Sequence, residues 1–106
     1  MRTPVSLATV RSAISKSQRT SFCYEGMMML ADLYLLGQAK KTGAFIVIAW
    51  CIQPARGWCH LRYSLMRDFE TKGTIDGVRD DFDPYDAKIV SIDTQIFRPR
   101  ARRVQA

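Results

Sequence analysis

Hydrophobic and polar residues alternate most regularly near the end of the chain. Val90, Ile92, Thr94 and Ile96 are separated by side chains that are mainly polar. Because successive side chains of a strand point to opposite faces of a sheet, this period of two predicts a half-buried strand over 90–97.

A different period marks the start of the chain. Leu7, Val10 and Ile14 are spaced three and four residues apart, so they fall on one face of a helix. The preceding Thr3-Pro4 can start such a helix, with threonine as the cap and proline at the first position, where the missing N–H does no harm. The pattern predicts a helix over 4–17 that packs on a sheet.

Between these two elements, apolar runs are separated by short turn sequences. The runs predict strands over 20–24, 27–36, 44–52 and 58–66, with 69–71 extending the last one after a kink. The second run is apolar nearly throughout, which also allows a helix, but the glycines on either side favour a strand that is buried on both faces.

Short polar segments join these strands. Glu25-Gly26, 40–43 and 54–57 have the composition of hairpin connections. Residues 72–86 contain glycine, proline and several aspartates and are predicted to be irregular. A connection of that length is often functional or flexible.

One helix followed by five or six short strands joined by hairpins predicts an α+β domain. The strands are expected to form an antiparallel sheet that curls into a small barrel. With 106 residues the chain has room for one core, so we expect a single domain over 1–97 and a basic, flexible tail over 98–106.

The net charge of +6 is unevenly distributed. Residues 1–64 carry eight Lys and Arg against two acidic residues, whereas residues 65–97 carry four against eight. Anionic partners are therefore expected for the first half of the chain and for the tail. The tail residues that could contact a nucleic-acid backbone without sequence specificity are Arg98, Arg100, Arg102 and Arg103. A solvated tail with no specific role is the alternative.

The three cysteines, Cys23, Cys51 and Cys59, lie at apolar, strand-like positions. Secreted disulfide scaffolds usually carry an even number of cysteines, so a reducing cytoplasm is the expected location. There is no run of about 18 apolar residues and no long apolar stretch near the N-terminus. Neither a transmembrane helix nor a signal peptide is therefore expected, and no membrane partner is predicted.

Several short motifs follow one another in a suggestive order. Tyr24 and Gly26 end one predicted strand, and Asp32 lies in the next. Phe45-Ile46-Val47 begins a hydrophobic strand, and Leu61-Arg62-Tyr63-Ser64 lies in the strand after it. This order resembles the WYL domain, which holds Tyr-x-Gly, an acidic residue, the naming triplet Trp-Tyr-Leu and Phe-Arg-Leu-Asp at these places. Here the naming triplet is replaced, and the last motif keeps only its arginine.

The resemblance implies an SH3-like or Sm-like barrel with a polar pocket for a nucleotide or a nucleic acid, used mostly in bacterial transcription regulation. The acidic stretch around Phe82 and Pro84-Tyr85 is similar to the end of short, stand-alone members, which lack a DNA-binding helix-turn-helix. Two positions depart from the family. Met29 stands where many members have a basic residue, and Ser64 stands where they have aspartate, so a repurposed pocket is an alternative.

Arg62 is the residue to which the resemblance assigns an anionic ligand. Its planar guanidinium can hold a phosphate or a carboxylate through two parallel hydrogen bonds. The other residues expected at this ligand-binding site are Tyr24, Tyr34, His60 and Ser64. The alternatives are a structural ion pair between Arg62 and Asp32 and an ordinary exposed arginine.

No metal or cofactor is predicted. Cys59 and His60 are neighbours in a strand and point to opposite faces, which argues against a shared metal ion or a Cys–His nucleophile. The aspartates of residues 80–86 lack the central glycine and the terminal glutamate of an EF-hand loop, so a solvated acidic loop is expected.

Two groups of apolar side chains have alternative roles. Trp50 and Trp58 are candidates for stacking on a base, although a tryptophan in a strand more often belongs to the core. The three methionines of residues 27–29 could form a pliable binding surface, but we expect two of them in the core and one outside it.

The sequence thus predicts a non-enzymatic regulatory module, because it contains no nucleophile–base–orienter set, metal motif or phosphate-binding loop. The expected ligand is a nucleotide or a single-stranded nucleic acid. The alternative is a protein–protein interaction or oligomerisation module without a small ligand, which pairs with itself or with a partner regulator.

Overall fold

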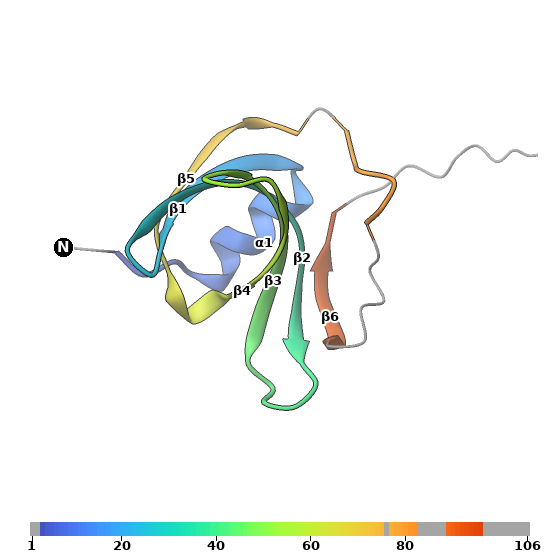
Figure 1. The fold of residues 1–106 in the computed structure, drawn as a ribbon. Helices are drawn as coiled ribbons and strands as arrows, with labels where there is room; N and C mark the ends of the chain where they lie inside the picture. The colour runs from blue at the N-terminus through green and yellow to red at the C-terminus, as the bar shows by residue number, and fades with distance from the viewer. Residues whose placement is uncertain (1–2, 76, 83–88, 97–106) are drawn as a thin grey trace, which may run out of the picture.

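The computed structural model describes residues 3–75, 77–82 and 89–96. Within these ranges one α-helix precedes six strands that form a single antiparallel sheet (Figure 1). The elements in chain order are α1 (Leu7–Ser15), β1 (Gln18–Tyr24), β2 (Met27–Ala39), β3 (Phe45–Gln53), β4 (Gly57–Arg62), the 3₁₀ helix η1 (Tyr63–Leu65), β5 (Met66–Thr74) and β6 (Ile89–Gln95). The α+β class is confirmed. No helix in these ranges combines the length and the apolar character that a membrane crossing needs.

Helix α1 begins at Leu7, later than the sequence predicts. Ser6 is its N-cap, because the Ser6 Oγ accepts a hydrogen bond from the Thr9 N–H at 3.1 Å. Thr3 is engaged elsewhere: its carbonyl oxygen accepts a hydrogen bond from the N–H of Asp68 in β5 at 2.9 Å. The first residues are therefore extended beside β5 instead of helical.

The apolar face of α1 lies inside the curve of the sheet (Figure 1). Val10 and Ile14 are fully buried, as their spacing predicts. They share one core cluster with Phe22, Ala31 and Leu33 of the first two strands. The main core therefore lies between α1 and the sheet.

The turn Glu25-Gly26 sets the register of the first hairpin. The φ angles of its two residues are 49° and 83°, the left-handed values typical of a two-residue hairpin turn. Glycine adopts such a φ without a steric penalty. Counting outward, the turn pairs Tyr24 with Met27 and Arg19 with Asp32.

Strand β2 forms ladders with three strands. One of its edges pairs with β3, whereas the other pairs with β1 as far as Asp32 and with β6 from Leu35 onward. The strand order is therefore β4-β3-β2-β1-β5, with β6 beside β2. Tyr34 lies between the β1 and β6 ladders, and its carbonyl oxygen accepts a hydrogen bond from the Ile96 N–H at 2.7 Å.

The sheet is strongly curved around α1 (Figure 1). Strands β4 and β5 are the two ends of the hydrogen-bonded path and do not pair with each other in the described residues. The Tyr24 hydroxyl accepts a hydrogen bond from the Arg62 N–H at 2.9 Å, which links β1 to the end of β4. A closed barrel is therefore not shown by these strands.

The predicted strand 58–66 is interrupted by η1. The chain turns there, so the kink precedes Met66 instead of following it, and β5 continues to Thr74. The Tyr63 hydroxyl donates a hydrogen bond to the carbonyl oxygen of Val5, which holds this corner against the N-terminal segment. Tyr63 and Val5 are far apart in the sequence, so the local pattern contains no sign of this contact. That pattern therefore predicted a continuous strand.

The last predicted strand is confirmed as β6. Ile92 is half-buried and Ile96 is buried, while Ser91 and Asp93 are exposed, which is the expected alternation. Of the predicted irregular stretch, residues 72–74 belong to β5. Its positions 76 and 83–86 lie outside the described residues.

The three consecutive methionines are not arranged as expected. Met29 is buried, but Met27 and Met28 expose 54% and 61% of their surface. The prediction of two core methionines is wrong, because these two residues lie at the turn end of the first hairpin, where the strand extends past the core.

An ion pair joins α1 to β6 and should make folding sensitive to acid. The Arg11 Nε and Nη2 donate to the Asp93 Oδ1 and Oδ2 at 2.7 and 2.9 Å. This contact, with a further hydrogen bond from Thr94, lowers the pKa of Asp93 from its ordinary 3.8 to about 2. A carboxyl group whose pKa falls on folding stabilises the folded state above its ordinary pKa, and this stabilisation is lost as the pH falls through the folded value.

We therefore expect the free energy of unfolding to decrease between pH 3.8 and about 2, and the decrease to be smaller in Asp93→Asn. Urea unfolding of both proteins across this range measures the difference. Equal losses in the two proteins would show that the ion pair does not contribute.

Candidate functional site

The candidate site begins with a buried ion pair. Because the turn sets the hairpin register, Arg19 in β1 lies opposite Asp32 in β2. The Arg19 Nε and Nη2 donate to the Asp32 Oδ1 and Oδ2 at 2.8 and 3.1 Å. Asp32 is only 4% exposed, and a carboxylate so far removed from water needs a partner of this kind.

Tyr34 lies two residues farther along β2 and forms a β-bulge. Its two neighbours in β2 pair with Ala49 and Ile48, which are consecutive in β3, so Tyr34 is the extra residue. Its side chain is buried, and its hydroxyl oxygen accepts a hydrogen bond from the Arg79 N–H at 2.9 Å. Burial raises the pKa of the Tyr34 hydroxyl. The bulge thus anchors the segment that follows β5.

Aromatic rings surround this anchor. Trp50 and Trp58 are cross-strand partners in β3 and β4, with ring centres 5.3 Å apart. The Trp58 ring lies 4.9 Å from that of Tyr34, and Phe82 lies 5.0 Å from the same tyrosine. These separations are typical of packed aromatic pairs. Both tryptophans are half-buried, and their stacking on a base stays a prediction.

The Arg79 guanidinium lies over this cluster. Its guanidinium carbon is 3.6 Å from the centre of the Trp50 ring, a cation–π contact. The Arg79 Nε and Nη2 donate to the Asp81 Oδ1 and Oδ2 at 3.0 and 3.3 Å. The Arg79 guanidinium, and then the Trp58 indole, hold the pKa of Asp81 below its usual value.

These groups border a space of about 260 Å³ that we call the arginine hollow. Its lining residues are Arg19, Asp32, Tyr34, Trp50, Ile52, Arg56, Ile75, Gly77 and Arg79. Arg56 is exposed in the β3–β4 hairpin, and its guanidinium has no hydrogen-bond or ion-pair partner among the described residues. With Asp81 on Arg79, three guanidinium groups face two carboxylates. Arginine is therefore the commonest charged residue in the described lining, which favours an anion.

Of the five residues predicted at the ligand site, only Tyr34 lines the arginine hollow. Tyr24 and Arg62 do meet, but through the Tyr24 hydroxyl and the backbone N–H of Arg62. The Arg62 side chain is exposed. It lies four residues beyond Trp58 in β4, roughly 13 Å away at the usual rise of a strand. Tyr24 and Arg62 thus belong to a corner of the sheet that is separate from the hollow.

The remaining predicted residues are not gathered at one place. The alternative pair of Arg62 with Asp32 does not form in the described structure, because Arg19 occupies both carboxylate oxygens. His60 is exposed in β4 and Ser64 is exposed in η1. The predicted backbone-binding residues Arg98, Arg100, Arg102 and Arg103 lie outside the described residues.

Sequence reasoning missed the three arginines of the hollow. Arg19 could have been found, because counting outward from a two-residue turn at Glu25-Gly26 brings it opposite Asp32. Arg79 lies in the irregular stretch whose length is itself a sign of function. For Arg56, no feature of the sequence distinguishes it from an ordinary arginine in a hairpin.

The cysteines do not suggest catalysis or metal binding. Cys51 and Cys59 lie on neighbouring strands, and burial, then the neighbouring Cys51, raise the pKa of the Cys59 thiol. A raised pKa lowers the thiolate fraction and thus the nucleophilicity. Cys59 is half-buried and His60 exposed, as strand alternation predicts. In the part of the chain that the structure describes, no three His, Cys, Asp or Glu side chains are grouped to hold a metal ion.

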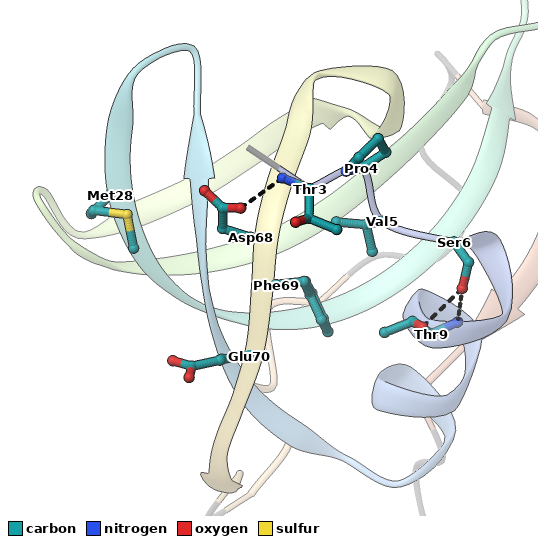
Figure 2. Close-up of a pocket in the computed structure, with 9 residues that line it drawn as sticks. All are labelled: Thr3, Pro4, Val5, Ser6, Thr9, Met28, Asp68, Phe69 and Glu70. Carbon is teal, nitrogen blue, oxygen red and sulfur yellow. Dashed lines mark hydrogen bonds between the residues drawn. The ribbon is translucent and has the colours of Figure 1, made fainter. Parts of the chain in front are cut away.

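A second hollow, of about 680 Å³, lies between the N-terminal segment, β5 and the first hairpin (Figure 2). Two carboxylates line it, and none of its described lining residues is basic, so it does not suit an anion. Both carboxylates already have partners. Asp68 accepts a hydrogen bond from the Thr3 N–H at 2.8 Å, as Figure 2 shows, and Glu70 pairs with Lys72 at 2.8 Å.

Comparisons of the chain with protein-family models, with curated proteins and with solved structures find no match. The resemblance to the WYL domain therefore rests on the residues of this chain.

The buried ion pair predicts a large loss of stability when one partner is removed. The substitution Arg19→Met leaves the Asp32 carboxylate buried without its arginine partner. We expect a loss of about 3 kcal/mol in the free energy of unfolding. The double variant with Asp32→Leu should recover most of this loss, because it removes the stranded charge.

Chemical unfolding measures these values. Arg11→Met is the matched control, because it breaks an arginine–carboxylate pair that is more exposed, and its effect should be clearly smaller. An Arg19→Met protein as stable as the wild type would contradict a structural role for the pair.

Proposed function

We propose that this chain is a non-enzymatic, ligand-binding regulatory module whose ligand is a nucleotide or a single-stranded nucleic acid, held in the arginine hollow. The observation that carries the proposal is the meeting of Arg56 and Arg79 with the ring of Trp50 around one space. One guanidinium group can bind a phosphate group through two parallel hydrogen bonds, and aromatic or guanidinium side chains stack on nucleotide bases. A nucleotide needs both kinds of contact.

The WYL resemblance supports the same proposal. We propose a short, stand-alone WYL-like module that acts in transcription regulation in the bacterial cytoplasm. The leading helix and the curved antiparallel sheet are compatible with it, and the Tyr24–Arg62 hydrogen bond draws β1 toward β4 as a closed SH3-like or Sm-like barrel would. In this proposal the arginine hollow replaces the predicted Arg62 site, because Arg62 faces solvent.

Substitution of Arg56 tests the site. Arg56→Gln removes the unpaired charge of the hollow, and we expect it to weaken binding of short labelled DNA and RNA oligonucleotides by about tenfold, the usual cost of a charge-assisted contact. Arg62→Gln is the matched control and should bind as the wild type does. Fluorescence anisotropy over a salt series measures both affinities.

A third protein separates the hollow from the tail. Replacing Arg98, Arg100, Arg102 and Arg103 by glutamine should flatten the salt dependence of any non-specific binding. If this variant alone loses binding, the tail is responsible and the hollow is not. If only Arg62→Gln loses binding, the site lies at the corner of the sheet.

One observation favours the second candidate, an interaction or oligomerisation module. Met27 and Met28 are large apolar side chains that stay more than half exposed at the tip of the first hairpin. If they mediate self-association, the weight-average mass should rise with concentration and fall to that of a monomer in Met27→Gln with Met28→Gln. Sedimentation equilibrium decides this, and a monomer at all concentrations would contradict self-association.

A further inference from the structure

We infer that Met27 and Met28, at the tip of the first hairpin, form a reversible oxidation site. Hydrogen peroxide converts their thioether groups to sulfoxides, and the apolar surface of this tip becomes polar while the fold is retained. The inference goes beyond the proposed function, because it needs no ligand in the arginine hollow. It depends on the exposure of these two side chains, on the chemistry of methionine and on the position of the tip outside the core.

The exposed large hydrophobic side chains of the described chain are both methionines. Met27 and Met28 expose 54% and 61% of their surface, and no other large hydrophobic side chain that the structure describes is exposed. The leucines, isoleucines, valines, phenylalanines and tryptophans are buried or half-buried wherever their side chains are described. Mild oxidants attack the sulfur of methionine and leave aliphatic side chains unchanged. An oxidant can therefore act on every large hydrophobic side chain that is exposed in the described part of the chain.

The reaction transfers one oxygen atom to sulfur. A lone pair of the methionine Sδ attacks one oxygen of hydrogen peroxide, the O–O bond breaks, an S–O bond forms, and the second oxygen leaves as water. The sulfur loses two electrons and the peroxide gains them. In the reverse step, two thiols of a reductant remove the oxygen as water and become a disulfide. The sulfoxide is a polar group in place of an apolar one, so the change in surface character can be reversed.

Two other methionines provide a comparison within the same chain. Met29 is 9% exposed and Met66 is fully buried, and both belong to the core cluster. Hydrogen peroxide reaches such a thioether only when the fold opens, and a sulfoxide oxygen placed in the core would be a polar group without a hydrogen-bond partner. Oxidation of these two residues is therefore slow and destabilising, whereas oxidation at the hairpin tip is neither.

The hairpin tip keeps its shape without help from the two sulfur atoms. Met27 and Met28 follow the turn Glu25-Gly26 directly and are paired with β1 through the backbone. Met28 also lines the second hollow, where Figure 2 shows it apart from the apolar side chains of Val5 and Phe69. A polar oxygen on either exposed methionine therefore changes the surface of the hairpin and not the packing of the core.

The cysteines are better shielded from the oxidant than the two methionines. Peroxide reacts with the thiolate form of cysteine. Cys23 and Cys51 are buried, and burial raises the pKa of the half-buried Cys59 thiol, which lowers its thiolate fraction. At mildly acidic pH the thiolate fraction falls further, while a thioether has no proton to lose and stays reactive. Such conditions separate methionine oxidation from cysteine oxidation.

Mass mapping of the full chain tests the site. The protein is treated with dilute hydrogen peroxide at about pH 5, where thiols are protonated, and tandem mass spectrometry follows each methionine with time. We expect Met27 and Met28 to gain one oxygen atom at least about tenfold faster than Met29 and Met66 do. Equal rates at all four positions, or faster oxidation of Met29, would overturn the inference.

A double variant, Met27→Leu with Met28→Leu, is the matched control for the change in surface. Leucine keeps the size and the apolar character of methionine but is not oxidised. Retention on a hydrophobic-interaction column should fall when the wild type is treated with peroxide and stay constant in the double variant. A methionine sulfoxide reductase supplied with a thiol should restore the wild-type retention. An equal fall in the double variant would contradict the assignment to these two residues.

Thermal unfolding before and after treatment tests whether the fold is retained. We expect the same midpoint in both states of the wild type, because the oxidised side chains lie outside the core. A lower midpoint or a loss of cooperative unfolding would show that oxidation damages the core, and the inference would fail. None of these readouts involves a nucleotide, so failure of the inference is distinct from failure of the proposed function.

Discussion

The structure depends on strand β2, one edge of which pairs first with β1 and then with β6. This strand pairs with β3 on one edge. On the other edge its pairing with β1 stops at Asp32, and its pairing with β6 starts at Leu35. Tyr34 lies in that gap as the extra residue of a bulge. A bulge bends its strand and increases the local twist. The bulge at Tyr34 therefore contributes to the curvature around α1, together with the other register shifts of the sheet, and it also anchors the chain after β5.

The same residue connects the fold to the candidate site. A buried phenol requires a hydrogen-bond partner, and Tyr34 finds it in the N–H of Arg79. This bond brings a segment from beyond β5 over the tryptophans of β3 and β4. The arginine hollow is thus built from strands that are close in sequence and from one segment that is far away. Its shape depends on the hydrogen bond between the Arg79 N–H and the Tyr34 hydroxyl, a polar group that lies inside an aromatic cluster.

Electrostatics explain why this hollow, and not the corner near Arg62, is the better candidate for an anion. Two of its arginines are held by carboxylates, which fixes their positions and cancels their charge. Arg56 retains its charge at the rim. The Arg62 side chain, in contrast, is exposed and does not line the hollow. A site needs ordered groups and residual charge together, and only the hollow offers both among the described residues.

The sequence by itself determined the features that depend on neighbouring residues: the buried face of α1, the alternation of β6, the turn Glu25-Gly26 and, through that turn, the register that pairs Arg19 with Asp32. Only the tertiary structure decided where α1 starts, because Thr3 is drawn to Asp68 in β5. It also decided that Arg79 meets Tyr34, 45 residues away. Such contacts depend on how distant segments pack, and no local pattern of residue types encodes them.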